Sequence, residues 1–141
     1  MFRAQDVMRL PVIKVGPQTK VEEAVDLLLK HDLSGLPVTD EEGHLLGMFS
    51  ELDQMTHLHQ SGGHQTVVDF MTRDVASVEI DEPIVDVARK FRELAVHRLP
   101  VLKNNQVVGI IGCRDVVRFV RKLETTRDEL VPLIGAAVQS G

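Results

Sequence analysis

Two short segments of this sequence place a glycine and an aspartate at the same spacing. The first is Gly47-Met48-Phe49-Ser50-Glu51-Leu52-Asp53, and the second is Gly109-Ile110-Ile111-Gly112-Cys113-Arg114-Asp115. Glycine permits close approach of the backbone, and the residue three positions later is placed to open a helix with free N–H groups. Such an N-terminus attracts phosphate through its donors and its dipole. An aspartate one turn later suits a vicinal diol, because one carboxylate accepts hydrogen bonds from both hydroxyls.

The first segment therefore reads as a nucleotide site, with Ser50 binding phosphate and Asp53 binding ribose. The same Ser-x-x-Asp spacing is also a capping box, which stabilises a helix by about 0.5–2 kcal/mol without any ligand. Taken alone, the capping box is the simpler interpretation. The recurrence of the whole surrounding pattern favours the site.

Both segments belong to a repeat that covers most of the chain. Nine residues recur, with an offset of 63 that becomes 62 after a one-residue deletion opposite Glu42. In the first copy they are Asp6, Met8, Val12, Val15, Leu36, Pro37, Val38, Gly47 and Asp53. Two copies of about 55 residues predict an object with an internal pseudo-two-fold axis and paired, related clefts.

Each copy is expected to fold in the order β-α-β-β-α. The first copy predicts a strand at 12–15, a helix capped by Thr19 and Glu22, a hairpin turning at 40–43 and a closing helix at 52–59. An apolar helical stripe supports the first helix: Val21, Ala24, Val25, Leu28 and Leu29.

The second copy predicts the same elements. They are a strand at 75–78, a helix with Pro83 in its first turn, a hairpin around 104–105 and a closing helix lined by residues 116–120. The predicted segments are 1–60 for the first repeat, 61–66 for the linker, 67–123 for the second repeat and 124–141 for a C-terminal helical tail. A single copy is too small to bury a three-stranded sheet and two helices, so the two sheets are expected to pack together in one α+β domain.

Composition narrows the function classes. The chain has 141 residues, a net charge of −5, no Trp, no Tyr and one cysteine. Basic patches and aromatic platforms for nucleic acid are missing, no apolar run is long enough to span a membrane, and the first residues lack a signal-peptide core. We therefore expect a cytoplasmic protein that binds neither nucleic acid nor membrane.

With Leu36-Pro37-Val38 and Leu99-Pro100-Val101 upstream of the two glycine segments, the chain resembles a tandem pair of CBS domains, a Bateman module, over about residues 4–121. The resemblance implies an α/β-type CBS fold and a regulatory module rather than an enzyme. It also implies an adenine nucleotide or adenosyl ligand (AMP, ADP, ATP or S-adenosylmethionine) between the repeats, with no other cofactor and no metal. A homodimer and an unidentified regulated protein are the implied partners.

The resemblance also implies roles for individual residues. Ser50 matches the phosphate-contacting position, Asp53 and Asp115 match the ribose position, and Arg98, assisted by His97, matches a basic position that reaches phosphate. The backbone at Val12-Ile13 and Val75-Ala76 would contact the adenine edge, and Leu36 and Leu99 would lie near its faces. Gly112 departs from the pattern, since it lacks a hydroxyl, and Arg114 would replace that contact.

We therefore expect two unequal sites. The alternative is a module that has lost its ligand and serves only dimerisation, which Gly112 and the Ser34-Gly35 pair favour slightly.

The histidines at 57, 59 and 64 are expected to be solvated linker residues, and Cys113 is expected to be buried or inert. The basic stripe Arg114, Arg118, Arg121 and Lys122 is expected to be a solvated face, with a phosphate or an acidic partner bound near Arg114 as the alternative. The tail is expected either to pack on the chain's own surface or to join a dimer interface.

Overall fold

The structure of the protein, a computed structural model, describes residues 1–58 and 65–134. Two copies of one arrangement follow each other, each preceded by a one-turn helix, η1 (Ala4–Asp6) and η2 (Val67–Asp69). The first copy holds α1 (Val21–Lys30), β1 (Gly35–Thr39), β2 (Leu45–Ser50) and α2 (Glu51–Leu58). The second holds β3 (Val78–Glu79), α3 (Ile84–Leu94), β4 (Arg98–Lys103), β5 (Gln106–Gly112) and α4 (Cys113–Ile134).

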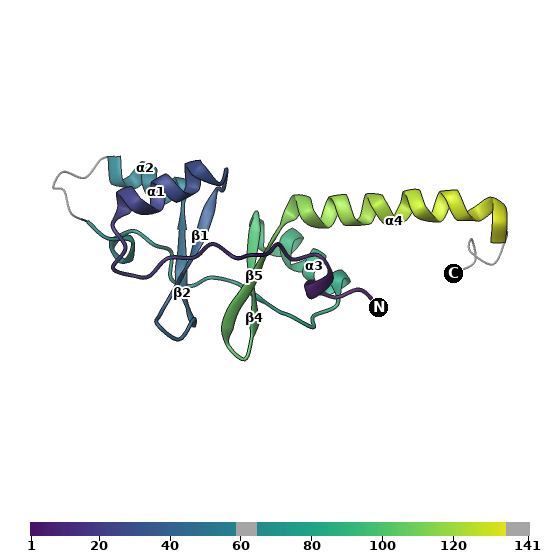
Figure 1. The fold of residues 1–141 in the computed structure, drawn as a ribbon, viewed down its shortest axis with the longest axis horizontal. Coiled ribbons are helices and arrows are strands. Elements are labelled where there is room, and N and C mark those ends of the chain that lie inside the picture. Colours follow the sequence, from purple (N-terminus) through teal and green to yellow (C-terminus); the bar gives the residue numbers. More distant parts are fainter. Residues whose placement is uncertain (59–64, 135–141) are drawn as a thin grey trace.

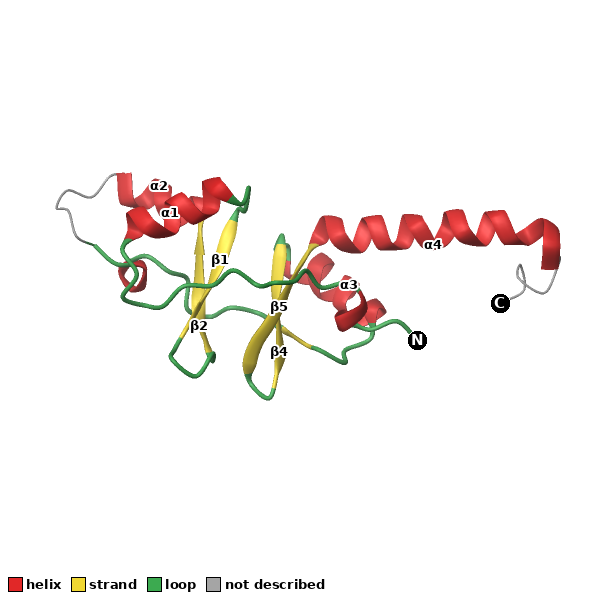
Figure 2. Ribbon diagram, viewed as in Figure 1, coloured by secondary structure: helices red, strands yellow, loops and turns green. Residues whose placement is uncertain are grey.

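The two sheets lie side by side in the middle of the molecule, and the helices flank them (Figures 1 and 2). β1 and β2 form an antiparallel hairpin, and β5 pairs antiparallel with β4, which pairs parallel with β3. The hairpin turns meet, since the Val107 amide donates to the Gly43 carbonyl at 2.9 Å. Sheet-to-sheet packing of two related repeats is confirmed.

Both predicted hairpin turns are confirmed by their backbone conformation. Gly43 has a φ of +88°, and Asn104 and Asn105 have φ of +51° and +65°. Asparagine and glycine tolerate this left-handed region better than other residues do.

The opening strand of each copy is shorter than predicted. Val15 makes only a single parallel bridge to Val38, so the strand predicted at 12–15 is wrong, and β3 begins at Val78 rather than at 75. The prolines of the repeated Leu-Pro-Val motif explain both results. Extending either ladder backwards needs an N–H at Pro37 or Pro100, and proline has none.

The predicted capping of α1 is also wrong. The Thr19 hydroxyl accepts from the Gly16 amide at 3.1 Å, and the helix starts at Val21, whose amide donates to the Gln65 carbonyl at 3.1 Å. The apolar stripe is confirmed for three residues and wrong for Leu29, which is 76% exposed; the buried members are Val21, Ala24 and Leu28. In α3, Pro83 occupies the N-cap position rather than the first turn.

The two copies exchange their opening segments. Ala4, from the start of the chain, is fully buried in the hydrophobic core of the second copy, while Val67 is fully buried in the core of the first. Equivalent backbone hydrogen bonds hold both exchanged segments. The Ile84 amide donates to the Phe2 carbonyl, and the Val21 amide donates to the Gln65 carbonyl. Neither copy is therefore a complete unit as a contiguous stretch of sequence.

α4 is one continuous helix across the predicted boundary at residue 124, and Pro132 does not interrupt it. Figure 1 shows it running away from the two sheets. The two expectations for the tail, packing on the chain's own surface or joining a dimer interface, stay predictions. An edge-to-face contact between Phe2 and Phe119, with ring centroids 4.9 Å apart, ties its first half to the N-terminus. Within the described residues, no helix combines the length and the apolar character that crossing a bilayer requires.

Candidate functional site

A cavity of about 620 Å³ lies where the two copies meet. Its walls are the junctions between the last strand and the last helix of each copy, around Ser50-Glu51 and Gly112-Cys113. Predicted site residues that line it are Ser50, His97, Arg98, Gly112, Arg114 and Asp115. The fold therefore joins the two equivalent junctions in one shared space.

At the first junction the capping box is formed. The Asp53 carboxylate, through Oδ2, accepts from the Ser50 amide at 2.8 Å and from the Ser50 hydroxyl at 3.1 Å. The Glu51 amide donates to the Ser34 carbonyl at 3.0 Å, so the first N–H of α2 is already used. The Asp53 amide in turn donates to the Ser50 hydroxyl at 3.4 Å, so a phosphate would reach this hydroxyl only after the Ser50–Asp53 contacts rearrange.

The second junction repeats this backbone geometry with different side chains. The Gly112 amide donates to Asp115 Oδ2 at 2.7 Å, and the Cys113 amide donates to the His97 carbonyl at 2.8 Å. Asp115 Oδ1 accepts from Arg9 Nε at 2.8 Å and lies 3.5 Å from an Arg118 guanidinium nitrogen. Asp115 is therefore paired with two cations.

Arg98 crosses from the second copy to the first. A Cβ on Gly35, the residue equivalent to Arg98, would lie 2.8 Å from an Arg98 guanidinium nitrogen. The absence of a side chain at Gly35 therefore makes room for Arg98. Burial lowers the pKa of Arg98, and the nearby Glu51 carboxylate opposes that shift.

The remaining predicted residues do not line the cavity. Leu36 and Leu99 are fully buried in the two hydrophobic cores, so in this conformation they have no surface to offer a ligand. Four half-buried residues of the two opening segments also lie outside the lining: Val12, Ile13, Val75 and Ala76. Asp53 does not line the cavity either. Their proposed contacts with adenine stay a prediction.

Sequence reasoning missed Arg9 and treated Arg118 as part of a solvated face. Both line the cavity, as does Arg114 from the same stripe. The signal for Arg118 was its helical spacing from Asp115, whereas Arg9 lies 106 residues from Asp115 in the chain. Cys113 was expected to be buried or inert; it is exposed and lines the cavity, so it is not buried, and its inertness stays a prediction. The histidines at 59 and 64 lie outside the described residues.

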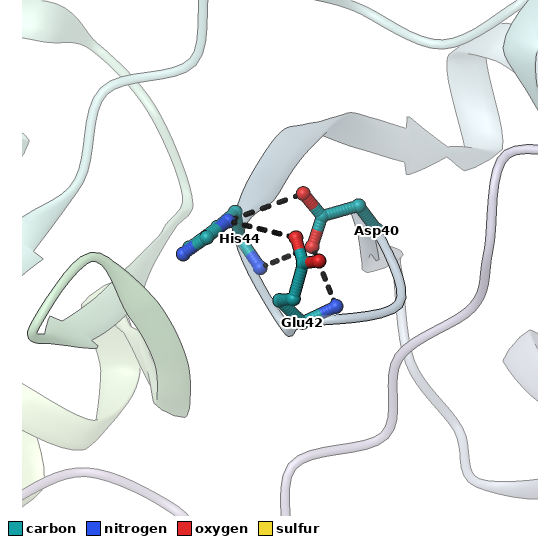
Figure 3. Close-up of side chains that lie close together, drawn as sticks. All are labelled: Asp40, Glu42 and His44. Carbon is teal, nitrogen blue, oxygen red and sulfur yellow. Dashed lines mark hydrogen bonds and ion pairs between the residues drawn. The ribbon is translucent and has the colours of Figure 1, made fainter.

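A separate group of potential metal ligands gathers on the first hairpin turn (Figure 3). One ligand atom from each of Asp40, Glu42 and His44 lies within 4.8 Å of the others. The Asp40 carboxylate already accepts from the amides of Glu42 and His44, both at 2.9 Å, and lies 3.2 Å from His44 Nδ1. These hydrogen bonds stabilise the hairpin turn, and they explain why the three side chains lie close together without a metal ion.

The turn predicts a pH effect. The His44 amide, followed by that of Glu42, holds the pKa of Asp40 below its ordinary value of 3.8, against the opposite effect of burial. Because the folded-state pKa is depressed, the carboxylate stabilises the fold above pH of about 3.8 and loses this effect as the pH falls through the lower folded value. Asp40→Asn should therefore be less stable at pH 7 and approach the unmodified protein at pH 3, measured by urea unfolding. An equal difference at both pH values would contradict this.

The family model described as "CBS domain" matches residues 4–53 and again residues 67–122. The chain belongs to the CBS domain family. It is a tandem CBS pair, and the two matched segments are the two structural copies.

CBS segments occur both in enzymes and in small proteins. The chain is 30% identical over 142 aligned residues to inosine-5'-monophosphate dehydrogenase of Aquifex aeolicus, covering 99% of this chain and 29% of that protein. It is 27% identical to the CBS domain-containing protein YhcV of Bacillus subtilis, covering 82% of this chain and 84% of YhcV. The chain spans less than a third of the length of the dehydrogenase it matches.

Solved CBS pairs share the fold. The CBS domain pair of protein MJ0100, in complex with 5'-methylthioadenosine and S-adenosyl-L-methionine, superposes with a TM-score of 0.78 at 30% identity, covering 86% of this chain and 98% of that one. CBSX2, an Arabidopsis thaliana protein, in complex with AMP gives a TM-score of 0.77 at 28% identity, covering 88% and 99%. A CBS pair as a ligand-binding regulatory module is thus supported at the level of the family.

Proposed function

We propose that this CBS pair is a regulatory module that binds an adenine nucleotide or adenosyl compound in the cavity between its repeats and has no catalytic activity of its own. The observation that carries the proposal is the shared cavity itself. It joins both strand-to-helix junctions, and structurally similar CBS pairs bind AMP or adenosyl compounds.

The chemistry of the cavity walls supports a phosphorylated ligand. Arg9, Arg98, Arg114 and Arg118 line it, and guanidinium groups bind phosphate through paired hydrogen bonds. At the opposite junction the Ser50 hydroxyl lines the cavity and suits phosphate. Asp53 does not line the cavity, and its carboxylate would bind ribose once its contact with the Ser50 hydroxyl rearranges. A bound ligand would contact both copies and so favour one relative arrangement of them, by its difference in affinity between the arrangements.

Asp53 provides the test. Asp53→Ala should abolish most of the rise in melting temperature produced by the ligand, because charge-assisted bonds to ribose contribute about 1.5–3 kcal/mol each. The measurement is a thermal-shift series with AMP, ADP, ATP and S-adenosylmethionine. Since the substitution also removes the capping box, the ligand-induced shift is compared within each variant. Asp26→Ala, on the exposed face of α1, is the matched control.

The alternative is a module that only assembles. Exposed apolar residues on α2 and α4 support self-association: Leu52, Met55, Val117 and Val120. We propose that a second copy of the chain covers them, which light scattering of the protein in solution would test. If no adenosyl compound stabilises the unmodified protein, assembly without a ligand replaces the sensing function. A regulated partner protein and a cytoplasmic location stay predictions.

A further inference from the structure

The two sides of the cavity are built on the same backbone but carry different charges. Arg9 bridges Ile110 on β5, its amide donating to the Ile110 carbonyl at 2.8 Å. Thr72 bridges Met48 on β2 in the same way, its amide donating to the Met48 carbonyl at 2.9 Å. Arg9 and Thr72 are therefore structural equivalents, and of the two Arg9 is bonded to the aspartate of its junction, Asp115.

The same comparison extends to the other cations of the cavity. Four arginines line it, and their equivalents in the other copy are uncharged; three of the four lie on the Asp115 side, whereas the Arg98 guanidinium crosses to Gly35 of the first copy. The arginines are Arg9, Arg98, Arg114 and Arg118, and the equivalents in the same order are Thr72, Gly35, Leu52 and Thr56. This difference in charge sets the two sides of the cavity apart chemically.

Asp115 is placed to hold guanidinium groups rather than a ribose. Oδ2 accepts from the Gly112 amide, while Oδ1 lies against both Arg9 and Arg118. The carboxylate is only 11% exposed, whereas the Arg9 and Arg118 side chains are 57% and 62% exposed. Their other N–H groups therefore keep access to the cavity, and each guanidinium has five donors in all. By contrast, the bonds to Asp53 from Ser50 converge on Oδ2 alone.

We propose that the α4 side of the cavity is an anion subsite for the distal phosphates of a nucleoside polyphosphate, with Arg9 as its specificity-determining residue. Asp115 is a positioning residue that orients Arg9 and Arg118. The nucleoside end then lies at the Ser50–Asp53 junction. This placement of the nucleoside rests on the proposed function, whereas the anion subsite rests on Arg9, Arg114 and Arg118.

The physical basis is the number of charge-assisted bonds. A monophosphate bound at Ser50 leaves the second junction without an anionic partner, whereas a triphosphate chain extends toward it. Each phosphate–guanidinium contact is worth roughly a factor of ten or more in affinity. ATP is therefore expected to bind at least about tenfold more tightly than AMP.

The test is isothermal titration with AMP, ATP and inorganic tripolyphosphate, in magnesium-free buffer at fixed ionic strength. Arg9→Thr introduces the residue of the equivalent position and should weaken ATP and tripolyphosphate binding by roughly tenfold, so that the ATP-to-AMP affinity ratio falls toward one. Arg9→Lys should recover part of that ratio, because it keeps the charge. Arg89→Thr, an exposed arginine of α3 paired with Asp86, is the matched control. Arg118→Gln repeats the measurement if Arg9→Thr does not fold.

The outcomes separate the two proposals. Equal affinities for AMP and ATP in the unmodified protein, or an Arg9→Thr effect that is the same for both, would overturn the anion subsite and leave the sensing function standing. Tripolyphosphate binding that depends on Arg9, with no binding of any adenosyl compound, would support the subsite and overturn the sensing function.

Discussion

Replacing Phe49 by alanine should lower the free energy of unfolding by about 3–5 kcal/mol. Phe49 is a fully buried side chain at the centre of the first hydrophobic core, which it shares with Leu36 and with Val67 from the exchanged segment. The substitution removes the ring and leaves a cavity between β2, α1 and that segment. The substitution therefore weakens the packing of the exchanged segment against the first copy, as well as the packing within that copy.

Urea unfolding measures the Phe49 effect. Leu29→Ala is the control, because Leu29 is 76% exposed and surface substitutions usually change stability by less than about 0.5 kcal/mol. A loss below about 1 kcal/mol for Phe49→Ala would mean that the core described around β2 is incorrect.

The second large effect is expected at Gly47. A Cβ at this position would lie 2.5 Å from the Thr72 carbonyl oxygen and 2.9 Å from Met71 Sδ. Thr72 is fixed in place by two backbone hydrogen bonds with Met48, both of 2.9 Å. Gly47→Ala must therefore displace backbone, and overpacking of this kind destabilises by about 1–3 kcal/mol.

Gly109 is the matched comparison for Gly47. The three atoms nearest to a Cβ there all belong to the Met8 side chain, with Sδ at 2.7 Å, and methionine adapts readily because it is unbranched. Gly109→Ala should therefore lower the melting temperature clearly less than Gly47→Ala does. A larger effect at Gly109 would show that the two exchanged segments are not held as described.

The two glycines also show which part of the packing the sequence could predict. Their recurrence correctly predicted a close backbone approach, but the groups that approach are Met71 and Thr72 at one glycine and Met8 at the other. The repeated glycine indicates that another group packs closely against the backbone at this position, but it does not indicate which residue that group belongs to. That neighbour comes from the other repeat's opening segment.

Several features within a few residues of each other were determined by the sequence alone. The capping box of Ser50 and Asp53 and the turns at Gly43 and at Asn104-Asn105 follow from local hydrogen bonding and backbone preference. The equally local capping pattern of Thr19 and Glu22 did not form. Membership in a duplicated family follows from the repeat itself. The lengths of the opening strands were also present in the sequence, in Pro37 and Pro100, but they become readable only once the pairing partner is known.

The tertiary structure decided what meets across the two repeats. It placed Arg9 on Asp115, laid Arg98 over Gly35 and buried Ala4 in the second core. These contacts join segments far apart in the chain, so their formation depends on how the two sheets pack and which segments are exchanged. No periodicity or motif spacing encodes that packing, and so the unequal charges of the two sides of the cavity become visible only in the folded protein.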